Sequence, residues 1–499
     1  MKRLFCTLLA SLLLLGALAS CGTAANTADT TAGDTIASSE VDTRETLDVP
    51  DTRYDGQELC FLTRAGQDQF TWATIEIFAE SQTSESDNIS NAVFERNDRI
   101  FQNYGVTITE IRKDTSGEHH TAISNETSAP TGDFQAVVTN VSNAASFSTN
   151  GFLWDLNGMD VEYMDFSKPW WDTNMAEGMS IDGRLFFATG DIMTLDNDAT
   201  FIIVFNKQMV VDCGIPDMYA LVENGEWTLD KFYEFEQQAV QDKNGDGKLS
   251  YDTDVCGFAY TQDVPYSTLF GGGITLCQKD ADDYPVYKLD VERAQNIAEL
   301  GKLIFADSLA INMSAISISQ GTSMVTLNQT AFGENHALFM SEVMQCVTRL
   351  RGFEADFGIL PFPKYNAAQE SYCSMMHGTA SVVAIPRSVN ADKLVMVNSM
   401  IEAMAYHSVD TLTEQYYEIN LKTKGARDEQ SGPMIDMILS GRVCDLSYYY
   451  GWGGNAFSQL ANCLLPSGGK SVASTSKSFE RAIGRNIEQL MKAMDKIGD

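Results

Sequence analysis

The sequence is poor in positive charge and in short enzyme motifs. Its 499 residues contain 34 Lys and Arg against 68 Asp and Glu, and only 5 His. A chain with this excess of acidic residues is repelled by nucleic acid and by anionic lipid, so we exclude both as ligands. No HExxH and no GxSxG motif occurs, which removes two common hydrolase signatures. The adjacent residues His119 and His120 do not have the spacing of metal ligands on a helix and predict a solvated loop.

Cysteine is too widely spaced for a metal ribbon or a redox pair. The chain has 10 Cys but no C-x-x-C, the spacing that such sites use. Cys6 and Cys21 lie near the N-terminus, and the other eight are Cys60, Cys213, Cys256, Cys277, Cys346, Cys373, Cys444 and Cys463. An even number permits disulfides in an exported protein, whereas the apolar surroundings of several favour buried thiols. The sequence leaves these two alternatives open.

Long apolar runs are also missing, except for one at the start of the chain. A Leu-rich run over residues 4–18 follows two basic residues and is too short to cross a membrane comfortably. We therefore predict a secretory signal peptide over residues 1–20. The residues Leu18-Ala19-Ser20-Cys21 resemble a bacterial lipobox, which implies a lipoprotein with diacylglycerol on Cys21. Cleavage without lipidation is the alternative.

Residues 21–53 lack the composition of a folded segment. From Gly22 to Pro50 there is no aromatic residue and there are few aliphatic ones, so this stretch cannot bury enough surface to fold. We predict a disordered tether behind the lipidated cysteine. It would hold the protein on the extracellular face of the cytoplasmic membrane by the lipid anchor alone. Residues 54–499 remain for globular structure, which is enough for two lobes with separate cores.

Beyond the tether, short β-like runs alternate with helical patterns. The runs at 59–63 and 136–139 are examples, and the alternation predicts an α/β fold with helices covering a sheet. The continuous apolar run Phe201–Phe205 predicts a strand buried on both faces. Thr228 is placed to cap the helix that follows it. The apolar period from Ser478 onwards predicts a long C-terminal helix.

A series of short motifs follows in order across residues 201–386. They are FIIVFNK at 201–207, Gly214-Ile215-Pro216, WTLDKF at 227–232, Gly271-Gly272-Gly273, FGENHALFM at 332–340, FGILPFP at 357–363 and Ala384-Ile385-Pro386. Together with the lipobox and tether, they resemble the extracellular solute-binding proteins of bacterial ABC importers, family 1. The resemblance is to the group that is similar to maltose-binding protein.

This resemblance implies a type II periplasmic-binding-protein fold of the α/β class, with two lobes joined by a multi-pass hinge. It places lobe 1 at residues 54–198 plus 364–408, and lobe 2 at residues 199–363 plus 409–499. The chain is then expected to cross between lobes near Asn197–Asn206, Leu360–Lys364 and His407–Thr413. Closure about such crossings buries a ligand between the lobes.

The same resemblance implies a monomer that hands a sugar or oligosaccharide to the transmembrane subunits of an ABC permease. It implies no enzymatic activity and no required cofactor. An exported carbohydrate-active hydrolase is an alternative, because paired carboxylates hydrolyse glycosides and 68 acidic residues offer many pairs. A surface adhesin is a second alternative. A binding protein, unlike either, is stabilised by a small ligand without forming product.

Sugar recognition predicts which side chains line the site. Sugar C–H faces pack on aromatic rings and hydroxyls need polar partners, while open α/β sheets bind ligands beyond the carboxyl ends of their strands. Tyr448–Gly454, with four aromatic residues and three glycines, predicts a loop with exposed rings. The alternative is that these rings fill the base of a lobe. The candidate ligand-binding residues are Gln67, Trp72, Asn140, Trp171, Asp191, Gly272, His377, Tyr449 and Trp452.

One further loop copies the opening of an EF-hand calcium site. Residues 242–247, DKNGDG, place oxygen ligands at positions one, three and five and glycine at six. Position twelve is Thr253 instead of a carboxylate, so the register is off by one unless a bulge brings in Asp254. We predict a structural Ca²⁺ here, with a solvated turn as the alternative. Its ligands would be Asp242, Asn244, Asp246, the carbonyl of Lys248, and Asp254.

Overall fold

The computed structural model describes residues 45–64, 76–80, 88–417 and 428–498. The chain divides into an N-terminal unit, Met1–Glu45, and a compact unit, Thr46–Asp499. Several predicted features lie outside the described residues. They are the signal peptide, the lipidation site at Cys21, most of the tether, and the candidate binding residues Gln67 and Trp72. Across the described ranges, no helix combines the length and the apolar character needed to cross a membrane.

The first sheet contains four strands in the order β11-β3-β1-β2. β1 (Glu58–Arg64) lies parallel to β2 (Thr107–Lys113) and to β3 (Ala136–Asn140), whereas β11 (Ser381–Ala384) runs antiparallel to β3. The central residues of β1, β3 and β11 are buried. Both β-like runs predicted in this part of the sequence are therefore strands of a predominantly parallel sheet.

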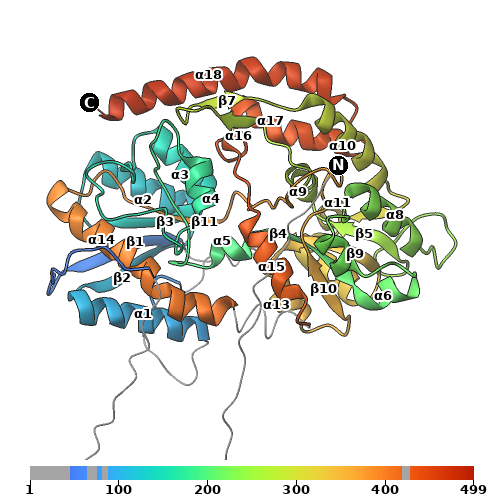
Figure 1. The fold of residues 1–499 in the computed structure, drawn as a ribbon, viewed down its shortest axis with the longest axis horizontal. Helices are drawn as coiled ribbons and strands as arrows, with labels where there is room; N and C mark the ends of the chain where they lie inside the picture. Colours follow the sequence, from blue (N-terminus) through green and yellow to red (C-terminus); the bar gives the residue numbers. More distant parts are fainter. Residues whose placement is uncertain (1–44, 65–75, 81–87, 418–427, 499) are drawn as a thin grey trace, which may run out of the picture. The chain divides into compact units, whose positions relative to one another are not determined.

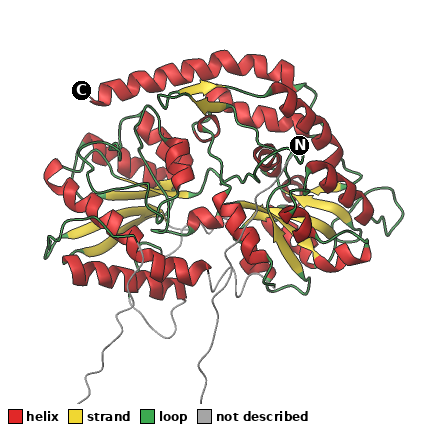
Figure 2. Ribbon diagram, viewed as in Figure 1, coloured by secondary structure: helices red, strands yellow, loops and turns green. Residues whose placement is uncertain are grey.

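Helices cover both faces of this first sheet (Figures 1 and 2). α1 (Asn88–Tyr104) and α14 (Ala391–Ser408) pack against each other on one face, and α2 (Ser116–Ser128) and α3 (Val141–Thr149) lie on the other. α2 begins at a capping box, in which the Thr115 hydroxyl accepts a hydrogen bond from the Glu118 N–H. The cap fixes where the chain turns back over the sheet.

His119 lies inside α2 and is 1% exposed. Its Nε2 donates to the Val138 carbonyl at 3.1 Å, and burial lowers the pKa of His119 to about 4. The prediction of a solvated loop at this residue was wrong. The capping box starts a helix that turns the ring into the core, where a neutral imidazole is favoured over a charged one.

The second sheet contains five strands in the order β10-β4-β9-β5-β8. β4 (Phe201–Asn206) runs antiparallel to both β10 (Phe357–Leu360) and β9 (Ala337–Val343). β5 (Cys256–Tyr260) is parallel to β9 and to β8 (Ala310–Asn312). The carboxyl ends of β5, β8 and β9 therefore lie at one edge, where β4 begins.

The remaining elements pack on the second sheet, add to the first lobe or connect the two lobes. The helices are α4 (Thr173–Met179), α5 (Leu195–Asp198), α6 (Lys207–Asp212), α7 (Met218–Glu223), α8 (Leu229–Ala239), α9 (Val264–Gly271), α10 (Val291–Ile304), α11 (Met313–Gln320), α12 (Met324–Gly333), α13 (Cys346–Leu350), α15 (Ser431–Ser440), α16 (Leu446–Tyr449), α17 (Trp452–Ala461) and α18 (Val472–Gly498). A hairpin of β6 (Cys277–Lys279) and β7 (Pro285–Tyr287), the π-helix η1 (Val409–Thr413) and the 3-10 turn η3 (Asn462–Leu464) complete the set.

Alternate residues of β4 face opposite layers of the core. Phe201, Ile203 and Phe205 belong to the core that includes α8, whereas Ile202 and Val204 belong to the core that includes α12 and α15. Every residue of β4 is buried. The prediction of a strand buried on both faces is confirmed, because successive side chains of a strand point to opposite sides.

Trp227 anchors the core on the α8 side of this sheet. The ring is fully buried against Phe232 and Phe235, and its indole N–H donates to the Pro361 carbonyl at 2.9 Å. Thr228 occupies the N-cap position of α8, as predicted, although its side chain makes no capping hydrogen bond. The motif around Trp227 thus fixes α8 against the strand that ends at Leu360.

The long C-terminal helix predicted from the apolar period is α18, which begins before Ser478. It lies along α17 and beside β7 (Figure 1). The residues of its buried stripe are Phe479, Ile483, Ile487, Leu490 and Met494. Burial of this stripe, more than helix propensity, holds a helix of this length in place.

The eight cysteines within the described ranges are all free thiols. Cys60, Cys256, Cys277, Cys346 and Cys463 are buried. Burial raises the pKa of the Cys256 thiol to about 12. Of the two alternatives that the sequence left open, the structure has buried thiols and not disulfides.

The first and second crossings between the sheets are paired with each other. Phe201 N–H donates to the Met375 carbonyl and His377 N–H donates to the Ala199 carbonyl, both at 2.9 Å, around an antiparallel bridge between Thr200 and Met376. This bridge falls within Asn197–Asn206, the range in which the first crossing is expected. The two backbone passes form a short ribbon, so they move as one unit.

The second crossing comes later in the chain than predicted. Lys364 still bonds to the second lobe, because its N–H donates to the Trp227 carbonyl and its own carbonyl accepts from Leu229. The chain reaches the first sheet only after His377, when Ala380 leads into β11. The expected crossing at Leu360–Lys364 was wrong, and the exact lobe boundaries stay a prediction.

The third crossing follows the end of α14. That helix continues into η1, which packs on α1 of the first lobe. Tyr416, a few residues later, belongs to the core of the second lobe. The π-helical turn thus carries the chain out of the first lobe close to the predicted position.

A buried ion cluster joins these passes. Arg442 Nη1 lies 2.7 Å from both Asp172 Oδ2 and Asp196 Oδ2, and Nη2 donates to the Asn197 side chain. Arg442 itself forms a parallel bridge with Ser374. The guanidinium therefore ties the first lobe and the first crossing to the segment that follows α15, and the backbone of Arg442 links that segment to the second crossing.

Replacing Arg442 with Met is expected to lower the free energy of unfolding by about 3–5 kcal/mol, because two carboxylates are left buried without a counter-charge. Urea denaturation measures the change. Lys231→Met, which breaks an exposed pair with Glu234 on α8, is the control and should change stability by less than about 0.5 kcal/mol. Adding Asp196→Asn to Arg442→Met should restore part of the loss. Simple addition of the two losses would contradict this account.

Two further carboxyls of the first crossing bond to the third crossing. Asp191 Oδ1 accepts from the Thr413 hydroxyl at 2.9 Å, and Asp198 Oδ1 accepts from the Tyr416 hydroxyl at 2.7 Å. Burial raises the pKa of each carboxyl to about 7. The negative charges of Glu76 and Asp196 raise the pKa of Asp198 further, whereas the Tyr416 hydrogen bond and the Arg349 charge lower it.

Lowering the pH from about 8 to about 5.5 is therefore expected to raise stability through these carboxyls. In the unfolded chain the pKa of an Asp carboxyl is about 4, so between that pH and the folded pKa of about 7 the folded chain binds more protons than the unfolded chain. The stabilisation is therefore complete below about pH 4 and is lost as the pH rises through about 7. Asp198→Asn keeps an acceptor for Tyr416 and should reduce the gain by about 1–3 kcal/mol. Urea denaturation at both pH values measures it, with the exposed Asp230→Asn as control. An unchanged pH dependence in Asp198→Asn would refute the assignment.

Candidate functional site

A small cavity opens at the carboxyl ends of the parallel strands in the first sheet. It has a volume of about 30 Å³ and is lined by Thr63 and Arg64 at the end of β1, Thr139 and Asn140 at the end of β3, and Ser381 at the start of β11. We call it the first-lobe cavity. Its position is the one at which open α/β sheets bind ligands.

A matching cavity, also of about 30 Å³, lies at the carboxyl edge of the second sheet. Asp263 follows β5, Glu342 lies at the end of β9, and Gln329 comes from α12. Phe201 and His377, from the paired crossings, complete one side. We call it the second-lobe cavity. The paired crossings thus contribute directly to its wall.

Charges of both signs line the second-lobe cavity. His377 Nε2 lies 3.8 Å from Asp263 Oδ2. Burial raises the pKa of Glu342 to about 7, and Asp263 adds to the rise, whereas the Arg349 guanidinium and the Asn328 amide oppose it. A carboxyl with a pKa near 7 is present in both forms around neutral pH, so it accepts hydrogen bonds when ionised and can also donate one when protonated.

Buried hydrogen bonds fix the approach to the first crossing beside the first-lobe cavity. Glu76 accepts from both the N–H and the hydroxyl of Thr194. Arg96, fully buried, donates to the carbonyls of Glu76, Ile77 and Ile192. Burial lowers the pKa of Arg96 to about 10. These bonds hold the start of the crossing rigidly against α1.

The structure brings two of the predicted ligand-binding residues to these cavities. Asn140 lines the first-lobe cavity and also caps α3, accepting from Asn143 N–H at 2.7 Å. His377 lines the second-lobe cavity. The segments after Asn140 and His377 are bonded together, since Ser142 N–H donates to the Gly378 carbonyl. The strand-end rule therefore places both residues at one junction.

Trp171 and Asp191 come together at a different place. They line a cavity of about 550 Å³ that is formed by α4, α5, η1 and α15. The Trp171 ring is buried, and its indole N–H donates to Glu402 Oε2 at 2.8 Å. Asp191 is held by Thr413. Trp171 is thus bonded to α14, and Asp191 is bonded to the third crossing.

The prediction of exposed rings in Tyr448–Gly454 was wrong. Tyr449 is 2% exposed and Trp452 is 5% exposed. Gly451 and Gly453 adopt positive φ, which lets the chain turn sharply between α16 and α17 so that the rings point inward. The Tyr449 hydroxyl donates to the Met376 carbonyl at 2.9 Å, so this ring supports the second crossing. The alternative, in which the rings fill a lobe, fits these positions.

Gly272 ends α9 and packs against α10. A Cβ at this position would approach Ile297 Cδ1 to 2.5 Å, so a side chain here would force the end of the Ile297 side chain to move. A ligand-binding role for Gly272 stays a prediction.

The EF-hand-like loop is held by its own backbone. Asp242 accepts from the N–H groups of Gly245 and Gly247, and Asp254 accepts from those of Lys243 and Ser250. Asn244 and Asp246 each accept from the N–H two residues on. In the ranges that the structure describes, no cluster of three His, Cys, Asp or Glu side chains suits a metal ion. Calcium binding at Asp242–Asp254 stays a prediction.

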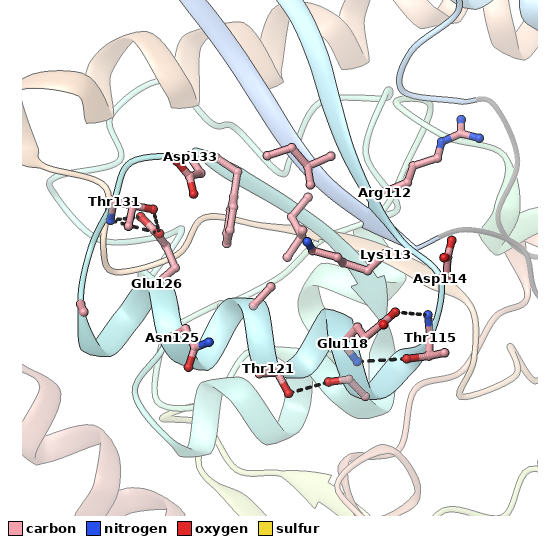
Figure 3. A pocket seen from close by; sticks show the side chains of 16 residues that line it. Arg112, Lys113, Asp114, Thr115, Glu118, Thr121, Asn125, Glu126, Thr131 and Asp133 are labelled. Carbon is pink, nitrogen blue, oxygen red and sulfur yellow. Dashed lines mark hydrogen bonds between the residues drawn. The ribbon is translucent and has the colours of Figure 1, made fainter.

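A groove of about 900 Å³ lies between the edge strand β2 and α2 (Figure 3). Lys113 points into it from the end of β2, and Asp133 faces it from the loop before β3. Glu118 is occupied by the helix cap, and Glu126 accepts from Thr131. The groove is open and its nearest carboxylates serve local turns, so it is a weaker candidate than the strand-end cavities.

Sequence reasoning missed the most distinctive residues of the second-lobe cavity. Asp263 follows a short apolar run, and the rule that selected Asn140 would also have selected it. Glu342 and Gln329 are harder to find, because they lie inside a buried strand and a buried helix. Glu342 and Gln329 become candidate binding residues only because some of their polar atoms have no hydrogen-bond partner. The sequence carries no signal for such unpartnered atoms.

No family model and no curated relative matches the sequence. Solved structures do match it. The GacH receptor of Streptomyces glaucescens, solved unliganded and with acarbose, is 13% identical over 86% of this chain and 98% of that chain, with a TM-score of 0.52. Maltose/maltodextrin-binding MalE of Bdellovibrio bacteriovorus, bound to maltotriose, is 12% identical over 86% and 100%, with a TM-score of 0.51.

The sugar-binding protein MalE of Xanthomonas citri is 11% identical over 89% of this chain and 100% of that chain, with a TM-score of 0.56. At such identities the likeness concerns the fold. It agrees with the two sheets, the paired crossings and the strand-end cavities described above. The chain therefore has the two-lobed α/β fold of the maltose-binding-protein-like solute-binding proteins, the group that its motifs resemble.

Proposed function

We propose that this protein binds a sugar or oligosaccharide between its lobes and delivers it to a membrane ABC permease. The observation that carries the proposal is the pair of polar cavities at the carboxyl edges of the two sheets, on either side of hydrogen-bonded crossings. Three matching structures are described as binding acarbose, maltotriose or sugars. Delivery to a permease is inferred from that likeness.

The chemistry of the cavities suits a neutral polyol. Asn140 and Gln329 offer amides, and Asp263 and Glu342 offer carboxyl oxygens that accept from hydroxyl groups. The net charge of −34 disfavours a strongly anionic ligand. A ligand that reaches both cavities would join the lobes, because each lobe supplies part of its hydrogen bonding.

We also propose that binding involves no chemical conversion. The matching structures are of binding proteins, and hinge closure about the paired crossings is sufficient to capture and release a solute. The protein would act as a monomer tethered by its lipid at Cys21, on the extracellular face of the cytoplasmic membrane. A carbohydrate-active hydrolase and an adhesin are the functions that the next experiment separates from this one.

A saccharide that binds the folded chain should raise its melting temperature without being altered. At a concentration 100 times its Kd, the gain in stability is about 2.7 kcal/mol. Thermal unfolding with maltotriose, acarbose and common hexoses measures the shift, and a reducing-end assay on the same samples detects hydrolysis. Asp263→Asn should weaken binding, with the exposed Asp230→Asn as the matched control.

Released reducing ends would support the hydrolase and contradict the proposal. Absence of stabilisation by every sugar of the panel would contradict sugar binding and favour the adhesin. A shift that is equal in Asp263→Asn and in the parent would place the ligand away from the strand-end cavities.

Replacing Cys21 with Ala should abolish lipid attachment. In a bacterial host that exports the full chain, labelled palmitate should mark the parent protein and not Cys21→Ala, which should move to the soluble fraction. Cys6→Ala is the matched control, because Cys6 lies within the predicted signal. Equal labelling of the parent and Cys21→Ala would contradict the predicted anchor.

A further inference from the structure

Two side chains of the second-lobe cavity carry buried polar atoms without a hydrogen-bond partner in the described part of the chain. Glu342 is 5% exposed and Gln329 is 6% exposed. Glu342 Oε1 accepts from Val343 N–H at 3.3 Å, but Oε2 has no partner, and neither does Gln329 Nε2. Leaving such a group unsatisfied costs free energy, so their conjunction in one cavity calls for an occupant.

The size of the second-lobe cavity limits that occupant. A volume of about 30 Å³ holds one small polar group and excludes a sugar ring. The cavity lies at the end of β9 and beside the paired crossings, so it is adjacent to the space between the lobes. An arm of a larger ligand can enter it while the ring stays outside.

We infer that the second-lobe cavity receives a single hydroxyl of the ligand, which donates to Glu342 Oε2 and accepts from the Gln329 amide. This deepens the proposed function and rests on it. It names the ligand class as a neutral saccharide with a free primary hydroxyl on a hydroxymethyl arm. Glu342 and Gln329 are then the residues that determine specificity at this end of the ligand.

Other small groups form a hydrogen bond with at most one of the two unpartnered atoms, Glu342 Oε2 and Gln329 Nε2. An ammonium group donates to Glu342 but has no lone pair for the Gln329 amide. A carboxylate accepts from Gln329, and the lining offers it Arg349 as well as the acidic Glu342 and Asp263, but it has no hydrogen to donate to Glu342 Oε2. A methyl group satisfies neither. A hydroxyl is the smallest group with one hydrogen to donate and lone pairs to accept, and in the free protein a water molecule has the same capacity.

The test compares sugars that differ only at the primary hydroxyl. D-glucose, D-galactose, D-mannose and maltotriose are measured by calorimetry beside their 6-deoxy and uronic acid forms, the maltotriose analogues being changed at the non-reducing end. The parent sugar that binds is expected to exceed both analogues in affinity by about 10- to 100-fold, because each analogue leaves a buried group unpaired.

The variant Gln329→Leu shows whether Gln329 recognises the ligand hydroxyl or only packs within the second lobe. Gln329→Leu should weaken binding of the parent sugar by about 10-fold and leave the 6-deoxy analogue nearly unchanged, so that discrimination collapses. Gln237→Leu, at an exposed glutamine of α8, is the matched control and should alter neither. A purely structural role of Gln329 would weaken both ligands equally.

Each result decides the inference. Equal affinity of the parent sugar and its 6-deoxy analogue overturns it while leaving sugar binding intact. Tighter binding of a uronic acid also overturns it, by assigning the cavity to an anion. If none of these sugars binds, the proposed function fails together with the inference, and that outcome differs from binding without discrimination. Should Gln329→Leu not fold, the comparison of analogues on the parent protein is sufficient.

Discussion

Arg442 places a permanent positive charge among buried carboxylates where several chain segments meet. Asp172 comes from the first lobe and Asp196 from the first crossing, and the backbone of Arg442 bridges to the second crossing. Because a buried charge must keep its partners, the lobes cannot separate at this point without a large loss of free energy. The crossings, the strand-end cavities and the hinge motion proposed for ligand capture all depend on this fixed point.

Much of the fold could be predicted from the sequence because single patterns determine it. The unbroken apolar run of β4 requires burial on both faces, and Trp227 with its following helix start marks α8. The second crossing was placed at Leu360–Lys364 by resemblance alone, whereas backbone hydrogen bonds to Trp227 and Leu229 hold Lys364 in the second lobe. The glycines of Tyr448–Gly454 indicated a loop, but their positive φ angles turn the rings inward.

The candidate site was predictable only in part. Asn140 follows from the rule that ligands bind beyond strand ends, His377 was selected because it precedes the strand at Ser381, and both line the cavities. Trp171 was selected for its ring, which is instead occupied by a hydrogen bond to Glu402. Glu342 and Gln329 could not be chosen from sequence, because an unpartnered atom is a property of the packed structure. The hydrophobic period and the order of motifs therefore predict the fold but do not predict which buried atoms are left to bind a ligand.

The buried thiols bear on where such a chain can fold. The eight cysteines within the described ranges are free thiols, so no disulfide has to form or isomerise there as the chain folds. Burial that keeps Cys256 protonated also withholds the thiolate, which is the form that reacts with oxidants and attacks disulfides. The same folded state is thus available in oxidising and reducing surroundings, without an oxidase or an isomerase.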